Sequence, residues 1–269
     1  MLTVSDYLAQ PVIYPDERIP YGDHVWQFGD LYLADTTQPT PVVIMIHGGC
    51  WQAAYDLTPL SACCADLRAR GYTVWSLEYR RLGNGGGWPY TFLDVAAGVD
   101  RLRDLAQPYM LDLNRVIAVG HSAGGQLALW LAARSRLPIT GQLYTPNPLP
   151  IQGVVALAAV ADLVQGVTKT ACGSACAELV GNDEVRYQEA SPRALLPLGV
   201  PHRHLVGHED LIVPAAYVAD FVATACQVGD PAHLTILPAC GHFELTTPSS
   251  TAWLSVVAAI DEILTQNRS

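Results

Sequence analysis

A serine flanked by glycines offers the clearest chemistry in the sequence. Residues 120–124 read Gly-His-Ser-Ala-Gly, between a short apolar run and an alanine- and leucine-rich segment. This G-x-S-x-G spacing suits a sharp turn from a strand into a helix, because side chains at the two glycines would collide with those elements. The turn would lift the serine hydroxyl clear of the sheet. We therefore predict that Ser122 is a nucleophile that attacks a carbonyl carbon.

A serine nucleophile needs a base, and the base needs an acid that orients it. His242 follows a glycine on a loop after the last strand-like run, and Asp210 follows the run before it. The order serine, acid, histidine is the one expected when the serine lies on a strand-to-helix turn. We predict a catalytic triad of Ser122, Asp210 and His242, with Glu209 as the competing acid.

A second glycine pair, Gly48 and Gly49, follows the apolar run 41–46. Glycines allow backbone N–H groups to turn inward without a Cβ in the way. Together with the amide of Ala123, these groups could donate hydrogen bonds to the oxygen that becomes negative during acyl transfer. We predict that the three amides form an oxyanion hole.

Four further residues are predicted to line the substrate pocket. Cys50 and Trp51 follow the glycine pair, His121 precedes the serine, and Trp88 follows a run of three glycines. For the two tryptophans, packing in the core or on the surface is the alternative. Glu78, Arg80 and Arg81 are interpreted as a structural ion-pair group.

Short apolar runs alternate with longer amphipathic segments, which is typical of βαβ units and a mostly parallel sheet. The segment before residue 41 is expected to add antiparallel strands, and residues 24–33 are the best candidate for one of them. Residues 162–199 do not follow this alternation and are interpreted as an insertion over the carboxyl edge of the sheet. Expected strands are 41–46, 73–77, 116–119, 153–158, 202–206 and 234–237, and expected helices are 58–70, 91–106, 122–134, 214–226 and 249–265.

These motifs together resemble the esterase and kynurenine formamidase branch of the α/β-hydrolases, over residues 41–245. The resemblance implies an α/β-hydrolase fold with a mostly parallel central sheet, helices on both faces and a short cap insertion. It also implies the same triad and oxyanion hole. Formamidases of this type usually carry tyrosine where this chain has Cys50, which leaves the formamide substrate open. We expect residues 1–269 to form a single domain with a cap-like insertion at about 162–199.

Three functions compete on the sequence. The leading hypothesis is a serine hydrolase that cleaves carboxylic esters or aryl-formamides of small to medium size through an acyl-enzyme, without metal or organic cofactor. A small peptidase or acyl-peptide hydrolase with the same triad is the second, and an acidic anchor for a free amino terminus, such as Glu178, Asp183 or Glu184, would favour it. A non-catalytic ligand-binding protein of the same fold is the third. The insertion is too short and too weakly amphipathic for a lipase lid, so long-chain lipids are not expected.

Composition excludes other partners and suggests a compartment. The formal net charge of −10 disfavours nucleic acid and anionic membranes. No segment reads as a signal peptide or membrane span. Seven cysteines without regular spacing are expected to be reduced thiols, as in cytoplasm, and Cys172 and Cys176 do not have a zinc spacing. The expected protein is a cytoplasmic monomer or homodimer.

Overall fold

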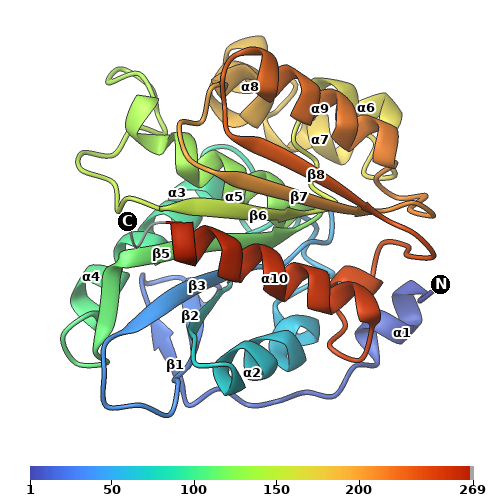
Figure 1. The fold of residues 1–269 in the computed structure, drawn as a ribbon. Helices are drawn as coiled ribbons and strands as arrows, with labels where there is room; N and C mark the ends of the chain where they lie inside the picture. The colour runs from blue at the N-terminus through green and yellow to red at the C-terminus, as the bar shows by residue number, and fades with distance from the viewer. Residues whose placement is uncertain (267–269) are drawn as a thin grey trace.

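The computed structural model describes residues 1–266 and is built around one eight-stranded sheet (Figure 1). The strand order is β1-β2-β4-β3-β5-β6-β7-β8; the β1–β2 and β2–β4 pairings are antiparallel, and the five pairings from β4 to β8 are parallel. The strands are β1 (Glu17–Pro20), β2 (Phe28–Tyr32), β3 (Thr40–Ile46), β4 (Thr73–Leu77), β5 (Leu111–His121), β6 (Gly153–Leu157), β7 (His202–Gly207) and β8 (Ala232–Leu237).

Helices cover both faces of this sheet. Helices α2 and α10 lie on one face, and α3, α5 and α9 lie on the other (Figure 1). The helices are α1 (Val4–Leu8), α2 (Ser61–Ala69), α3 (Tyr90–Asp100), α4 (Leu102–Leu105), α5 (Ala123–Ala133), α6 (Leu163–Lys169), α7 (Ala175–Leu179), α8 (Glu184–Ala190), α9 (Ala215–Gln227) and α10 (Thr251–Gln266); the 3₁₀ turns are η1 (Thr58–Leu60), η2 (Arg134–Arg136), η3 (Pro192–Leu195) and η4 (Glu244–Thr246). Within residues 1–266, no helix is long and apolar enough to cross a membrane.

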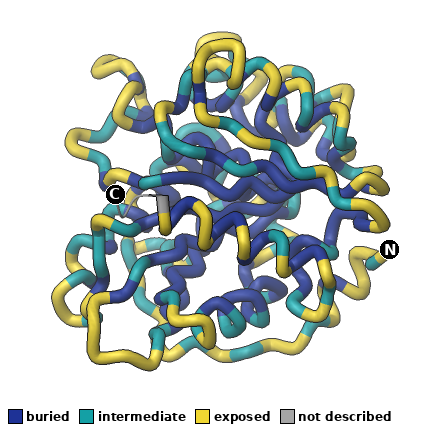
Figure 2. Tube along the Cα trace, in the orientation of Figure 1, coloured by how far each residue is buried: buried dark blue, intermediate teal, exposed yellow. Residues whose placement is uncertain are grey.

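The central strands are hydrophobic because both of their faces are covered. Every residue of β4 and β6 is buried, and so are six of the seven residues of β3. Figure 2 shows this buried layer through the middle of the molecule, with exposed residues on the outer sides of the helices. Continuous apolar runs are what a parallel sheet between two helical layers requires.

The sheet register brings the predicted motifs together. Ile46 at the end of β3 pairs with Gly120 near the end of β5, so the loops that follow these strands leave side by side. Gly207 at the end of β7 likewise pairs with Leu237 of β8. Since parallel strands end at the same edge, the segments that carry Asp210 and His242 emerge next to one another, at the edge where Ser122 lies.

Residues 162–199 form three short helices and η3, grouped with α9 (Figure 1). Tyr217 of α9 fastens this segment by donating from Oη to the carbonyl of Asp162 at 2.7 Å and accepting from its amide at 2.8 Å. Between α6 and α7, the amide of Ala171 donates to the carbonyl of Ile212 at 2.8 Å. The insertion therefore reaches the loop that follows β7, at the carboxyl edge of the sheet.

The cysteine prediction was wrong in one respect. Cys50, after β3, and Cys172, between α6 and α7, form a disulfide with a Cα–Cα distance of 5.3 Å. Cys176, four residues after Cys172 in the sequence, is a free buried thiol. Two cysteines 122 residues apart carry no pairing signal in their spacing, and only the fold brings them together. The reduced-thiol argument for a cytoplasmic protein is therefore lost, and that location stays a prediction.

Candidate active site

Ser122 lies at the turn between β5 and α5 in a backbone conformation that an L-residue rarely adopts. Its φ is +55° and its ψ is −118°. A Cβ on Gly120 would lie 2.1 Å from the carbonyl oxygen of Gly124, and one on Gly124 would lie 2.2 Å from that of Ile46. Neither contact is sterically allowed. Glycine is thus required on both sides of the serine, and the strained turn is held by close packing of strand and helix.

His242 and Asp210 form a buried pair beside the serine. The Nδ1 of His242 lies 2.7 Å from Oδ2 of Asp210. The other carboxylate oxygen, Oδ1, accepts hydrogen bonds from the amides of Ile212 and Val213, both at 2.8 Å. Because a carboxylate can only accept, Nδ1 must carry the proton and Nε2 is left free as a proton acceptor. Glu209 points away into solvent and pairs with His208 at 3.0 Å.

Gly48 passes directly against the serine. A Cβ at Gly48 would lie 3.0 Å from Cβ of Ser122 and 2.8 Å from the carbonyl oxygen of His121. Gly49 has a φ of +102°, so the chain turns sharply at the glycine pair. Ala123 is the first residue of α5, where an amide has no partner within the helix. The three predicted oxyanion donors are therefore found on two segments that meet at Ser122.

A buried ion-pair group holds the glycine loop in place. The Nε2 of His47 lies 3.0 Å from Glu78, whose carboxylate also accepts from Arg81 at 3.1 Å. The His47 ring stacks on Tyr79 with centroids 4.4 Å apart, and Tyr79 Oη donates to the His47 carbonyl at 2.8 Å. These side chains are fully buried. The structural interpretation of Glu78 and Arg81 is confirmed, and Arg80 pairs instead with Asp94.

His121 connects the serine turn to the histidine loop. Its Nε2 lies 3.0 Å from the carbonyl oxygen of His242, and a carbonyl can only accept, so this nitrogen donates. The two imidazole centroids are 4.4 Å apart. Burial, followed by the neighbouring His242, lowers the pKa of His121 well below its usual value of 6.5. His121 therefore stays neutral and acts as a donor that fixes the loop.

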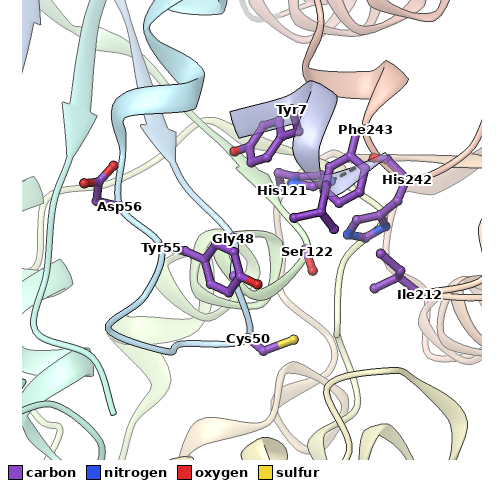
Figure 3. Close-up of a pocket in the computed structure, with 12 residues that line it drawn as sticks. Tyr7, Gly48, Cys50, Tyr55, Asp56, His121, Ser122, Ile212, His242 and Phe243 are labelled. Atoms are coloured by element: carbon purple, nitrogen blue, oxygen red, sulfur yellow. Dashed lines mark hydrogen bonds between the residues drawn. The ribbon is translucent and has the colours of Figure 1, made fainter. Parts of the chain in front are cut away.

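Ser122 and His242 open into a small cavity of about 100 Å³ (Figure 3). Figure 3 shows Ser122 between Tyr55 and His242, with Tyr7 and Phe243 above and Cys50 below. Most of the lining is apolar. The lining residues are Val4, Tyr7, Gly48, Gly49, Cys50, Tyr55, Asp56, His121, Ser122, Ile212, His242 and Phe243.

Two predicted pocket residues do not reach this cavity. Trp51 is fully buried and donates from its indole N–H to Oε1 of Gln126 at 3.1 Å, so its role is in the core. Trp88 donates to Gln142 at 2.7 Å and lies outside the lining. In the sequence, a tryptophan beside a glycine-rich loop that lines a pocket cannot be distinguished from one that packs elsewhere. Cys50 and His121 do line the cavity.

The sequence did not reveal six lining residues. Ile212 and Phe243 are neighbours of the predicted triad residues, and that proximity was their only signal. Tyr55 and Asp56 belong to a loop without a recognisable motif. Val4 and Tyr7 come from α1, a five-residue helix that is exposed except at Tyr7, so it has no apolar periodicity.

The acidic residues that would favour the peptidase hypothesis also lie outside the cavity. Glu178 and Asp183 make local contacts, with Ser174 at 2.8 Å and with the amide of Arg186 at 3.1 Å. Glu184 is exposed. None of the three lines the cavity. Within residues 1–266, no group of three or more His, Cys, Asp or Glu could hold a metal ion, and a reaction without metal stays a prediction.

The strand order, the two-sided helical cover and the serine turn define an α/β-hydrolase fold. The family model of BD-FAE matches residues 30–223, and the chain belongs to this family.

Known proteins of similar sequence and fold are esterases by name. Esterase LipC of Mycobacterium tuberculosis is 31% identical over 113 residues, which are 41% of this chain and 28% of LipC. The chain thus spans little more than a quarter of the length of this relative. Esterase B of Lactobacillus rhamnosis superposes with a TM-score of 0.80 at 20% identity, covering 97% of this chain and 90% of that one. A truncated carbohydrate esterase from gut microbiota gives a TM-score of 0.76 at 20% identity, covering 92% and 95%. The resemblance to kynurenine formamidases is not confirmed by these proteins.

Proposed function

We propose that this protein is a carboxylic ester hydrolase that acts through an acyl-enzyme on Ser122. The observation that carries the proposal is the arrangement at the sheet edge. A strained, buried serine shares a cavity with a histidine whose Nδ1 is held by Asp210 at 2.7 Å. The names of the relatives support ester cleavage over formamide or peptide cleavage.

Each group has one task in the proposed reaction. His242 Nε2 takes the proton of Ser122 as the hydroxyl oxygen attacks the ester carbonyl. The amides of Gly48, Gly49 and Ala123 donate to the carbonyl oxygen as it becomes negative. His242 then returns the proton to the departing alcohol, which leaves the acyl group on the serine. Water, deprotonated by the same nitrogen, releases the acid.

The size of the cavity supports a short acyl or alcohol group next to the serine. The cavity beside Ser122 has a volume of about 100 Å³. Sites for drug-sized ligands are several times larger, from about 300 Å³. The substrate proposed here is therefore an ester that places a small group, and not a long acyl chain, in this cavity.

The proposal is tested by labelling and by a substrate panel. We expect a fluorophosphonate probe to label the wild type at Ser122 and to leave Ser122→Ala unlabelled. Ser122→Ala should lose hydrolysis of p-nitrophenyl acetate by several orders of magnitude, because removal of a serine nucleophile typically costs that much. Circular dichroism provides the folding control.

The same panel separates the rival functions. It contains N-formylkynurenine and an aminoacyl naphthylamide beside the p-nitrophenyl esters. Faster turnover of either amide than of every ester would replace ester hydrolysis by the formamidase or peptidase hypothesis. Binding without turnover of any compound, and without labelling, would indicate the non-catalytic alternative.

A further inference from the structure

The cavity wall includes a helix that lies far from the triad in sequence. Val4 and Tyr7 of α1 line the same cavity as Ser122. Every other residue of α1 is exposed, whereas the relative solvent accessibility of Tyr7 is only 7%. A helix of five residues is not stable by itself in water, so its contacts with the rest of the molecule must hold it there.

These contacts are made with the loop that carries His242. Glu244 accepts from the amide of Leu2 at 2.6 Å and, through its other oxygen, from the amide of Gly241 at 3.0 Å. The Tyr7 ring stacks on Phe243 with centroids 5.0 Å apart and an interplanar angle of 22°. Farther along, Gln10 donates to the carbonyl of Thr246 at 3.2 Å. The helix is thus attached to the histidine loop on both sides of Tyr7.

The Tyr7 ring fills space that the cavity would otherwise gain. It lies 6.2 Å from the imidazole of His121, centroid to centroid, and Figure 3 shows it above the serine. Burial of the phenol raises the pKa of Tyr7, so the side chain remains uncharged. An uncharged, tightly packed ring is a fixed apolar wall, and such a wall sets a limit to the length of the group beside it.

We infer that α1, through Tyr7, sets the size limit for the substrate group in the active-site cavity. The inference rests on the proposed ester hydrolysis and adds a specificity-determining residue. Replacement of the ring by a methyl group would extend the cavity under α1. Each methylene that then becomes buried should raise kcat/KM about fourfold, which corresponds to about 0.8 kcal/mol.

The test compares Tyr7→Ala with the wild type on two ester series. One series is p-nitrophenyl acetate, butyrate, hexanoate and octanoate, in which the acyl group grows. The other is the acetates of alcohols from methanol to hexanol, in which the alcohol grows. We expect Tyr7→Ala to raise the kcat/KM ratio of the six-carbon to the two-carbon ester at least tenfold in the first series, or that of hexyl to methyl acetate equally in the second.

Three further variants make the result specific. Tyr7→Phe keeps the ring and should keep the wild-type order of preference. Tyr14→Ala removes a tyrosine that is 82% exposed and outside the cavity, and should leave activity unchanged. Val4→Phe adds bulk at an exposed residue of the cavity wall, so it should fold readily and should narrow the preference toward the shortest ester.

The outcomes separate this inference from the proposed function. If folded Tyr7→Ala and Val4→Phe both keep the wild-type order of ester preference in both series, α1 does not set the size limit. Ester hydrolysis itself would not be affected by that result. Should Tyr7→Ala not fold, Val4→Phe alone decides. A wild type that hydrolyses no ester in either series would overturn both.

Discussion

At the scale of single residues, Asp210 determines which nitrogen of His242 can act as a base. Its Oδ1 is occupied by two backbone amides and its Oδ2 by His242 Nδ1. An asparagine at this position would place its carbonyl oxygen toward the two amides and its NH₂ group toward Nδ1. Nδ1 would then have to accept, and the proton would move to Nε2, where it blocks deprotonation of the serine.

We therefore expect Asp210→Asn to lower kcat for p-nitrophenyl acetate by on the order of 10³–10⁴, with little change in fold. The neighbouring Glu209→Gln is the matched control. The Glu209 side chain is 53% exposed and its carboxylate pairs with His208, so activity should stay within about twofold of the wild type. If Glu209→Gln showed the large loss and Asp210→Asn did not, the acid would be misassigned.

The chemistry of the site could be predicted from sequence, but its walls could not. A serine turn or an oxyanion loop depends on glycines at fixed spacing, since only glycine tolerates contacts such as the 2.1 Å approach at Gly120. A wall residue such as Tyr7 or Tyr55 needs only size and position, which many residues supply. Its place depends on the whole fold, and no local pattern predicts it. The catalytic roles themselves remain predictions until the variants are measured.

At the scale of elements, the central strands β3 and β6 were predicted well because each is an almost continuous apolar run. The strand expected at 116–119 begins earlier, at Leu111, where its pairing with β3 shifts register near Pro41. The helix expected at 91–106 is divided at Arg101 into α3 and α4. The helices of the insertion were missed because they have five to seven residues each, too few for an amphipathic repeat.

Strand β7 carries a buried histidine pair that makes the stability of this element depend on pH. His202 Nδ1 lies 2.8 Å from His204 Nε2, and both rings are buried, with His204 against Phe221. Burial lowers the pKa of His202, against the opposing influence of Asp230, while Arg203 lowers it further. Burial, and then His202, lowers the pKa of His204 well below its usual value.

These shifts predict a loss of stability in mild acid. A histidine with a lowered pKa is neutral in the folded state, whereas in the unfolded chain it takes up a proton below about pH 6.5. Its stabilising contribution is therefore complete above that pH and is lost as the pH falls. The free energy of unfolding should decrease by about 1.4 kcal/mol per pH unit for each such histidine.

Urea unfolding between pH 5 and 8 measures this slope. We expect His204→Asn, which cannot titrate, to have a lower free energy of unfolding at pH 8 and a shallower decline below pH 6.5. His233→Asn replaces an exposed histidine on β8 and should keep the wild-type slope. Parallel curves for the wild type and His204→Asn would show that the pair does not control the acid response.

At the scale of the whole molecule, the disulfide links the segment that follows β3 to the insertion. Cys50 directly follows Gly48 and Gly49 and lines the cavity, whereas Cys172 belongs to the insertion. The cross-link closes a loop across 122 residues of sequence, including β4, β5, β6 and the serine turn. It could not be predicted because seven cysteines allow many pairings. That residues 1–269 form a single domain also stays a prediction.

A cross-link over such a loop restricts the unfolded chain and should stabilise the fold considerably. In the chain-entropy model, a loop of about 100 residues corresponds to about 4.7 kcal/mol. For a chain of this size, 1 kcal/mol shifts Tm by about 2–4 °C, so Cys172→Ser should lower Tm by on the order of 10 °C. Cys172 is the residue to change, because it lies outside the cavity lining and its replacement alters no lining residue directly.

Calorimetry with and without dithiothreitol tests the cross-link and its link to catalysis together. The reductant should lower Tm of the wild type toward that of Cys172→Ser and should not affect the variant. Cys226→Ser removes an exposed free thiol and should behave as the wild type. Because the disulfide holds the residue after Gly49, its loss should also release the predicted oxyanion amides, so kcat should fall more than KM rises.

Equal Tm for Cys172→Ser, Cys226→Ser and the reduced wild type would mean that the cysteines are not joined in the folded protein. A large loss of Tm with unchanged kcat would mean that the cross-link stabilises the fold without positioning the oxyanion loop.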